Sequence, residues 1–328
     1  MISRSSRRLL GVLVVPLLFA SACSSANSVN VQHNKTGGGK GGYKVNIAVI
    51  THGGPGDAFW SVVKNGVQQA GKDLGDKIGY QSSADPTTQA QYINAAVNQK
   101  PDGIVVSMAN PQALKAAVIA ATKAHIPVIV INSGVDQWQQ YGAQSYIGSD
   151  EGVAGRAVGT ELKRNGKKNV ICVIHEAGNT SLEQRCKGVA KTLGGKVTNL
   201  QVDINNLQAA QSTMQSKLQQ DKTVDAVVTL NAQAASYAEK AITAANSSAK
   251  LATFDLDAGV CKDILAGKIL FSVDQQPYLQ GYLAVQMLTL YKANLNILGG
   301  GQPVLTGPAL ITKANAKAVL KLSAGGTR

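Results

Sequence analysis

The residues of this chain best suited to binding chemistry are carboxylates, amides, one arginine and two aromatic rings, each close behind a hydrophobic segment. They are Asp57, Phe59, Trp60, Asn132, Arg185, Asn231, Asp255 and Gln275. Carboxylate, amide and guanidinium groups exchange hydrogen bonds with hydroxyl groups, and aromatic rings cover apolar C–H faces. A sugar or polyol presents both kinds of surface. The polar residues could instead only cap the helices that follow them, as Asp and Asn commonly do.

One motif is similar to a hydrolase feature, but the rest of that chemistry is missing. His52-Gly53-Gly54-Pro55-Gly56 matches the oxyanion loop of some α/β-hydrolase peptidases, which also need a G-x-S-x-G serine followed by an acid and a histidine. No serine has glycine at both −2 and +2, and the phosphate-binding pattern G-x-x-x-x-G-K-[ST] does not occur. The pattern G-x-G-x-x-G does not follow the hydrophobic segment 45–50, the first predicted strand. We therefore expect no enzyme, no catalytic residue and no cofactor. The glycines instead allow a tight turn that directs Asp57, Phe59 and Trp60 toward a cleft.

The elements that must position these residues alternate regularly from Lys44 onward. Short segments dense in Val and Ile predict buried strands at 45–50, 103–108, 127–132, 169–175, 225–230, 251–254 and 269–273. Ala-rich segments between them predict helices at 59–74, 87–98, 111–124, 152–164, 182–193, 209–220, 234–245 and 278–291. This alternation is typical of α/β proteins with parallel sheets covered on both faces. It continues too long for one sheet, so we expect two Rossmann-like lobes that divide near residues 146–150, where a short strand precedes a new helix.

Composition narrows the class of protein. The chain has 328 residues, 44% of them hydrophobic and 16% charged, which suits a two-domain protein with ordinary cores. The net charge of +13 would suit an anionic partner, but the lysines are scattered and form no basic stripe with aromatic residues. We therefore expect no nucleic-acid binding. The four histidines show no metal-ligand spacing against the cysteines, so we expect no metal site.

The N-terminal segment is typical of an export signal. Three arginines in the first eight residues precede the apolar run 9–20, which is too short to span a bilayer comfortably, and the small-residue site Ala20-Ser21-Ala22. Cys23 follows directly, an arrangement that resembles a bacterial lipobox, although an ordinary signal peptide remains the alternative. We expect residues 1–22 to be a signal peptide and 23–43 to be a lipidated Cys23 with a flexible tether. The protein would then be exported and either anchored by lipid to the outer face of the cell membrane or periplasmic.

Export also bears on the remaining cysteines. Cys172, Cys186 and Cys261 would lie outside the reducing cytosol, where disulfides persist. Three cysteines allow at most one internal disulfide. Cys172 lies on a predicted strand and Cys186 near the start of the next helix, so we predict this pair and leave Cys261 out.

Residues 44 to about 312 resemble the type I solute-binding proteins of ABC transporters, in the ribose- and galactose-binding branch. The resemblance rests on several separated motifs: 56–60, 127–132, 146–150 with Gly155 and Gly159, 178–181 with Arg185 and Gly188, 230–231, 254–255 and 274–277. It implies two lobes joined by a three-strand hinge, with the first lobe at 44–148 plus 276–312 and the second at 149–275 plus part of the C-terminal tail. It also implies a monomer whose Asn231, Asp255 and Gln275 complete the second-lobe half of the site, with Arg185 reaching the ligand. We expect the chain to cross between the lobes near Ser149, Asp255 and Gln275, and these crossings to form the hinge. We expect Gln276 to be a hinge residue as well.

The resemblance implies capture of a small sugar or polyol and its delivery to an ABC permease. Aldose binders of this family commonly carry Asp followed by Arg where this chain has Asn132-Ser133. Losing both charges removes one charged clamp from the first lobe, so a hexose, another pentose or a polyol such as inositol is as well suited as ribose. A signalling receptor of the same fold, for a furanosyl autoinducer or a nucleoside, stays open as the alternative function.

Overall fold

The computed structural model describes residues 44–54 and 56–328. The predicted signal peptide, Cys23 and the tether lie outside the described residues. The rest of the chain forms two six-stranded sheets, each covered by helices on both faces.

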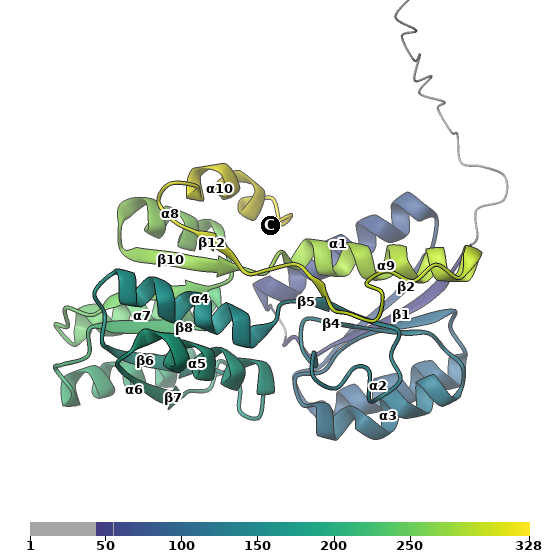
Figure 1. Cartoon of the computed structure of the whole chain (residues 1–328), viewed down its shortest axis with the longest axis horizontal. Helices are drawn as coiled ribbons and strands as arrows, with labels where there is room; N and C mark the ends of the chain where they lie inside the picture. The colour runs from purple at the N-terminus through teal and green to yellow at the C-terminus, as the bar shows by residue number, and fades with distance from the viewer. Residues whose placement is uncertain (1–43, 55) are drawn as a thin grey trace, which may run out of the picture. The chain divides into compact units, whose positions relative to one another are not determined.

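The first sheet is entirely parallel, in the strand order β11-β5-β4-β3-β1-β2. Its strands are β1 (Asn46–Thr51), β2 (Lys77–Ser82), β3 (Gly103–Ser107), β4 (Val128–Ile131), β5 (Ser145–Gly148) and β11 (Val304–Leu305). One face packs against α1 (Ala58–Leu74) and α9 (Pro277–Asn294), and the other against α2 (Pro86–Gln99) and α3 (Pro111–Lys123). Figure 1 shows these two helix pairs on opposite sides of the sheet. The central strands are buried throughout, which explains their continuous Val and Ile content.

The second sheet repeats this order as β12-β10-β9-β8-β6-β7, with only β12 antiparallel. Its strands are β6 (Asn169–Ile174), β7 (Lys196–Gln201), β8 (Ala226–Thr229), β9 (Lys250–Phe254), β10 (Ile269–Asp274) and β12 (Ala309–Ile311). One face packs against α4 (Glu151–Arg164) and α5 (Thr180–Leu193). The other packs against α6 (Leu207–Gln220), α7 (Ala232–Ala244), α8 (Ala258–Ala266) and α10 (Ala316–Ala324). Position for position, β6 to β10 therefore correspond to β1 to β5.

This architecture confirms the predicted fold class, and the predicted strands and helices are all present. Six elements were not predicted: β2, β7, β11, β12, α8 and α10. Strands β2 and β7 lie at sheet edges and contain only partly buried and exposed residues, so they lack the dense Val and Ile pattern. The other four are short, and short elements carry little periodicity.

The chain passes between the two sheets three times: at 149–150 after β5, at 275–276 after β10, and at 306–308 between β11 and β12. The first two crossings match the expected positions near Ser149 and Gln275. The third does not, because Asp255 lies between β9 and α8, which both belong to the second lobe. The chain also returns to the second sheet at Ala309, earlier than the expected first-lobe boundary at 312.

Side-chain hydrogen bonds tie the second and third crossings together. Gln276 adopts a left-handed backbone conformation, with φ 57°, and its Nε2 donates to the Thr306 carbonyl at 2.6 Å. The Thr306 hydroxyl donates in turn to the Gln275 carbonyl at 2.7 Å. Gln280 Nε2 also donates to that carbonyl, at 3.0 Å. The placement of Gln276 is the one expected for a hinge residue.

The second lobe contains a disulfide. Cys172 on β6 is bonded to Cys186 on α5, with Cα atoms 5.8 Å apart. The bond joins a central strand to the helix that follows it, inside the cluster that packs α4 and α5 against the sheet. Cys261 is buried on α8 and is not disulfide-bonded.

Candidate functional site

The site lies where the carboxyl ends of the strands of both sheets meet, as expected for open parallel sheets. A narrow pocket there, called here the inner pocket, is lined by all eight residues singled out from the sequence, together with His52, Ser133, His175, Glu176, Asn179, Ser181, Leu182 and Leu230. Its free volume is only about 40 Å³. A water molecule has a share of about 30 Å³ in the liquid, so the pocket has to widen to admit a sugar ring.

The first lobe presents Asp57, Phe59 and Trp60 from the start of α1. Gly56, with φ 77°, makes the turn into the helix. Asp57 caps α1 by accepting from the Trp60 backbone N–H at 3.2 Å, and the same residue lines the pocket. Trp60 is 5% exposed and belongs to the core beneath the pocket, with its ring edge-on to Phe59 at 5.2 Å between centroids. Asp57 therefore caps the helix and also lines the pocket, and Trp60 packs in the core and also lines the pocket.

The loops after β4 and β9 occupy equivalent positions in the two lobes and carry Asn132 and Asp255. Both residues have left-handed backbone conformations, with φ 62° and 66°. Such conformations are costly for residues other than glycine and often occur at functional sites. Gln275 connects the two side chains: its Nε2 donates to Asp255 Oδ1, and its Oε1 accepts from Asn132 Nδ2 at 3.4 Å. The site residues of the two lobes thus contact each other directly.

Arg185 forms a buried ion pair with Glu151 at the base of the second-lobe half. Nε and Nη2 both donate to the Glu151 carboxylate, and the side chains are 4% and 1% exposed. Nη2 also donates to Gln275 Oε1 at 2.8 Å, and Nη1 donates to the Leu230 carbonyl at 3.0 Å. Of the five guanidinium N–H bonds, these contacts leave one on Nη1 for a ligand. Arg185 therefore lines the pocket while it organises the neighbouring side chains.

The Phe254 ring contacts this ion pair, and two glycines allow the helices that carry it to pack closely. The guanidinium lies 4.5 Å from the centroid of the Phe254 ring, a cation–π contact. A Cβ on Gly155 would lie 2.1 Å from the Arg185 carbonyl oxygen, and one on Gly188 would lie 2.7 Å from the Gly152 carbonyl oxygen. The glycines therefore allow α4 and α5 to approach closely enough for Glu151 to reach Arg185.

Sequence reasoning missed Glu151 and the two histidines. Glu151 directly follows Asp150, the cap of α4, and a carboxylate in the first turn of a helix is common without any buried partner. His52 and His175 stand directly after β1 and β6, at equivalent positions in the two lobes. That placement after a buried strand is the signal that could have identified both.

Each lobe contributes one histidine and one aspartate with displaced pKa values. Burial lowers the pKa of His52 to about 3 and that of His175 to about 4, so both rings are neutral near pH 7. Burial raises the pKa of Asp57 to about 6 and that of Asp255 to about 7, the latter against the opposing effect of Arg185. The pKa of Arg185 is raised despite its burial because the Glu151 carboxylate lies beside it. Near pH 7 Asp57 is therefore mostly ionised and Asp255 about half ionised, while both histidines are neutral.

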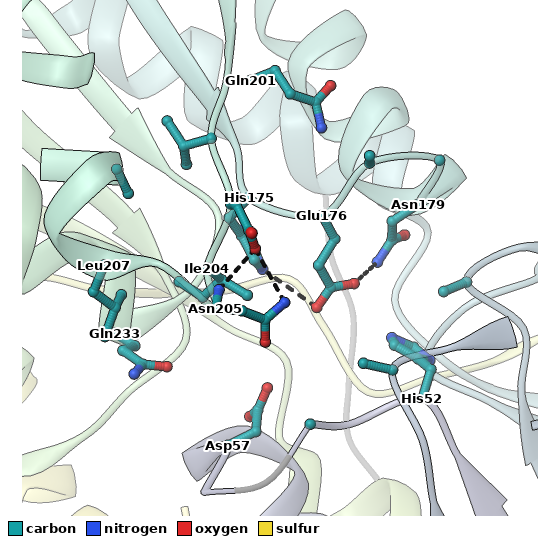
Figure 2. A pocket seen from close by; sticks show the side chains of 18 of the residues that line it. His52, Asp57, His175, Glu176, Asn179, Gln201, Ile204, Asn205, Leu207 and Gln233 are labelled. Atoms are coloured by element: carbon teal, nitrogen blue, oxygen red, sulfur yellow. Dashed lines mark hydrogen bonds and ion pairs between the residues drawn. The ribbon is translucent and has the colours of Figure 1, made fainter. Parts of the chain in front are cut away.

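A larger space, called here the outer cavity, adjoins the inner pocket and has a volume of about 910 Å³. The two share the residues His52, Asp57, His175, Glu176 and Asn179. Figure 2 shows this cavity, with Asp57 on the opposite side from Glu176 and with Asn205, Leu207 and Gln233 along one wall.

Two lobes of equivalent topology, three crossings and a pocket lined from both sides define a type I periplasmic binding protein. The sequence matches the family described as periplasmic binding protein domain over residues 47–294. The chain belongs to this family, whose members are substrate receptors rather than enzymes. This membership confirms the resemblance found in the sequence and the expectation that the chain is not an enzyme.

The chain is similar to several carbohydrate-binding relatives. A carbohydrate transporter protein from Acidothermus cellulolyticus, solved in complex with myo-inositol, is 42% identical with a TM-score of 0.86, and the match covers 87% of this chain and all of that one. The ribose import binding protein of Haemophilus influenzae is 28% identical over 73% of this chain and 82% of its own length. The xylose/arabinose-binding protein of Sulfolobus acidocaldarius is 26% identical over 74% of this chain, which spans 64% of that relative.

Two features are absent from the part of the chain that the structure describes. No helix within 44–54 and 56–328 combines the length and the apolar character needed to cross a bilayer. The same residues contain no group of three or more His, Cys, Asp or Glu side chains placed to hold a metal ion.

Proposed function

We propose that this protein is the substrate-binding component of an ABC transporter, which captures a small sugar or polyol between its lobes and delivers it to a permease. The observation that carries the proposal is the convergence of aromatic, amide and carboxylate side chains from both lobes on one pocket. Phe59 and Trp60 offer apolar surface to a ring face, while Asn132, Asn231 and Asp255 offer hydrogen bonds to its hydroxyl groups.

The ligand we favour is a cyclitol such as myo-inositol. Asn132 and Ser133 bring neutral groups to the first-lobe half, and Ser133 Oγ donates to Asn132 Oδ1 at 2.8 Å. A cyclitol carries hydroxyl groups around the whole ring, which suits amides that both donate and accept. The 42% identical relative that was solved with myo-inositol supports the same choice.

Binding is coupled to movement of the lobes. The inner pocket as it stands is too small for a ring, so the ligand enters a more open arrangement and the lobes then close over it. Two further hydrogen bonds join the lobes beside the pocket, from Thr180 N–H to the Ala109 carbonyl at 3.1 Å and from Gln184 Nε2 to Asp136 Oδ2 at 2.6 Å. A ligand that contacts both halves favours the closed arrangement because those contacts are complete only there.

The protein works outside the cell membrane, held there by lipid on Cys23. Support comes from the export signal that precedes Cys23 and from the family, whose members act outside the cytoplasm. Replacing Cys23 by Ala should leave uncut or released protein in fractionated cells, whereas the neighbouring control Ser24→Ala stays processed and membrane-bound. A processed, membrane-bound Cys23→Ala variant would contradict the anchor.

A thermal-shift screen of the purified mature protein tests the proposed function. The panel is myo-inositol, D-xylose, L-arabinose, D-ribose, D-galactose and D-glucose, with the open-chain polyol sorbitol as a control. A ligand that binds only the folded state raises the unfolding temperature as its concentration passes Kd. We expect the largest shift with myo-inositol and none with sorbitol. No shift with any ring compound would contradict the function.

A further inference from the structure

The outer cavity is large, and five of the residues that line it also line the inner pocket. Its volume of about 910 Å³ lies in the range of ligand sites, about 300–1,000 Å³. The inner pocket, in contrast, has a free volume of only about 40 Å³. Because His175 and Glu176 line both spaces, a ligand bound in the inner pocket has a direct path for a substituent into the outer one.

The walls of the outer cavity combine two kinds of surface. Gln201, Asn205 and Gln233 are exposed amides, while Ile204 and Leu207 are half-buried apolar residues beside them. Figure 2 shows Leu207, Ile204 and Gln233 close to Asn205 on one wall. Amides beside an apolar surface match a second sugar ring, which again has hydroxyl groups at its rim and C–H groups on its faces.

The charges in the outer cavity restrict what that second ring can carry. Glu176, Asp57 and Asp203 supply carboxyl groups, and none of the described residues lining the cavity is Lys or Arg. The two histidines that line it are held neutral by burial. An anionic substituent such as a phosphate or a uronate would meet like charge with no cationic partner.

We propose that the outer cavity is a second subsite, which takes an uncharged glycosyl extension of the ring bound in the inner pocket. The protein would then capture glycosides as well as free rings. This inference rests on the proposed function, because the first ring has to occupy the inner pocket.

Calorimetric titration of the mature protein with matched ligand pairs tests the subsite. The pairs are myo-inositol with 1-O-α-galactosyl-myo-inositol, D-xylose with xylobiose, and D-glucose with maltose and with cellobiose. We expect at least one glycoside to bind within tenfold of the Kd of its free ring. If a free ring binds and every glycoside is more than tenfold weaker, the cavity is only an entrance and the inference is overturned. If no ring and no glycoside binds, the proposed function fails with it.

A cavity-filling variant separates the two spaces. Ala209 lies on α6, is exposed and lines the outer cavity, so Ala209→Trp should place an indole ring there without disturbing the core. We expect at least a tenfold loss of affinity for the glycoside and less than a twofold change for the free ring. The matched control, Gln208→Trp, alters the adjacent exposed residue, which does not line the cavity, and should change neither. Equal effects of Ala209→Trp on both ligands, or no effect on either, would overturn the inference.

Single amide changes and a charged ligand complete the test. Gln233→Ala should weaken glycoside binding about fivefold, the effect of one neutral hydrogen bond, and leave the free ring unaffected. The aldobiouronic acid that replaces the outer glucose of cellobiose by glucuronic acid should bind at least tenfold more weakly than cellobiose. Equal binding of the acidic and neutral disaccharides would overturn the charge restriction.

Discussion

The two lobes have equivalent sheets but present different chemistry to the pocket. After β4 the first lobe carries the neutral Asn132, and at the matching position after β9 the second lobe carries Asp255, both with left-handed backbones. The first lobe adds the aromatic rings of Phe59 and Trp60, while the second adds the buried pair of Arg185 and Glu151. The same scaffold therefore presents an aromatic half, whose carboxyl group is Asp57, and a half built on a hydrogen-bonded ion pair.

The division implies different roles for the two halves. In the second lobe Arg185, Glu151, Gln275 and Asp255 are already hydrogen-bonded to one another, so these groups are fixed before a ligand arrives. Fixed donors and acceptors lose little entropy on binding, which favours affinity. The first lobe covers the ligand with rings when the lobes close. We therefore expect substitutions in the second lobe to have the larger effects.

The largest effect is expected from removing Arg185. Arg185→Ala leaves the Glu151 carboxylate buried without its partner, and breaking such a pair typically costs about 3–5 kcal/mol of folding free energy. Urea unfolding followed by circular dichroism measures this loss. Arg164→Ala, an exposed arginine on α4, is the control and should change stability by less than about 0.5 kcal/mol. The double variant Arg185→Met/Glu151→Leu should recover most of the loss. Unchanged stability of Arg185→Ala would show that the pair does not organise the lobe.

The second-largest effect is expected on ligand affinity, where Asp255 and Asn132, which occupy equivalent positions, can be compared. Hydrogen bonds to a charged group contribute about 1.5–3 kcal/mol, so at pH 8, where Asp255 is mostly ionised, Asp255→Asn should weaken binding by roughly 10- to 150-fold. Neutral hydrogen bonds contribute about 0.5–1.5 kcal/mol, so Asn132→Ala should weaken it by roughly 2- to 12-fold. Calorimetric titration with the ligand from the screen measures both. A larger loss for Asn132→Ala would reverse the assignment of roles.

The raised pKa of Asp255 should be visible in the pH dependence of stability when wild type is compared with Asp255→Asn. The pKa of Asp255 is raised from 3.8 to about 7, so its contribution to stability is complete below pH 4 and is lost as pH rises through 7. His52 and His175 act in the opposite sense, because their lowered pKa values give stability that is present above about 6.5 and lost as pH falls through 4 to 3. The wild-type curve therefore mixes both effects. The stability of Asp255→Asn relative to wild type should increase between pH 4 and pH 8, measured by urea unfolding. A constant difference would mean that Asp255 is not buried as described.

The smallest effect is expected at the contact between Gln184 and Asp136, which joins the lobes at an exposed position. Gln184→Ala removes one hydrogen bond of the closed arrangement and should weaken ligand binding by about two- to fivefold, with stability unchanged. Glu183→Ala on the same helix serves as the control. Equal affinities of wild type and Gln184→Ala would show that closure does not depend on this contact.

The sequence predicted the fold well because parallel strands buried on both faces are dense in Val and Ile, as β3 and β4 are. It also identified eight residues of the inner pocket, because polar residues after parallel strands gather at one edge of a sheet. Glu151 escaped prediction because its partnership with Arg185 depends on how closely α4 packs on α5. The third crossing was misplaced at Asp255 because two-residue β11 and three-residue β12 leave almost no pattern.

The outer cavity could not be predicted for a similar reason. Its walls combine the loop after β7, the start of α6 and residues of the first lobe. Strand β7 itself was not recognised, and exposed amides such as Gln201 and Gln233 have no signal in a sequence with many glutamines. The cavity forms only where these segments, which are far apart in the sequence, come together in the fold.

The most direct test of the account is a crystal structure of the mature protein grown with the ring compound that gives the largest thermal shift. The account predicts ligand density in a widened inner pocket, with Phe59 or Trp60 against one face of the ring. Asp255 and Asn231 should lie within hydrogen-bonding distance of its hydroxyl groups. Density elsewhere, or a ligand contacted by one lobe alone, would contradict the central claim that both halves of the site hold the ligand together.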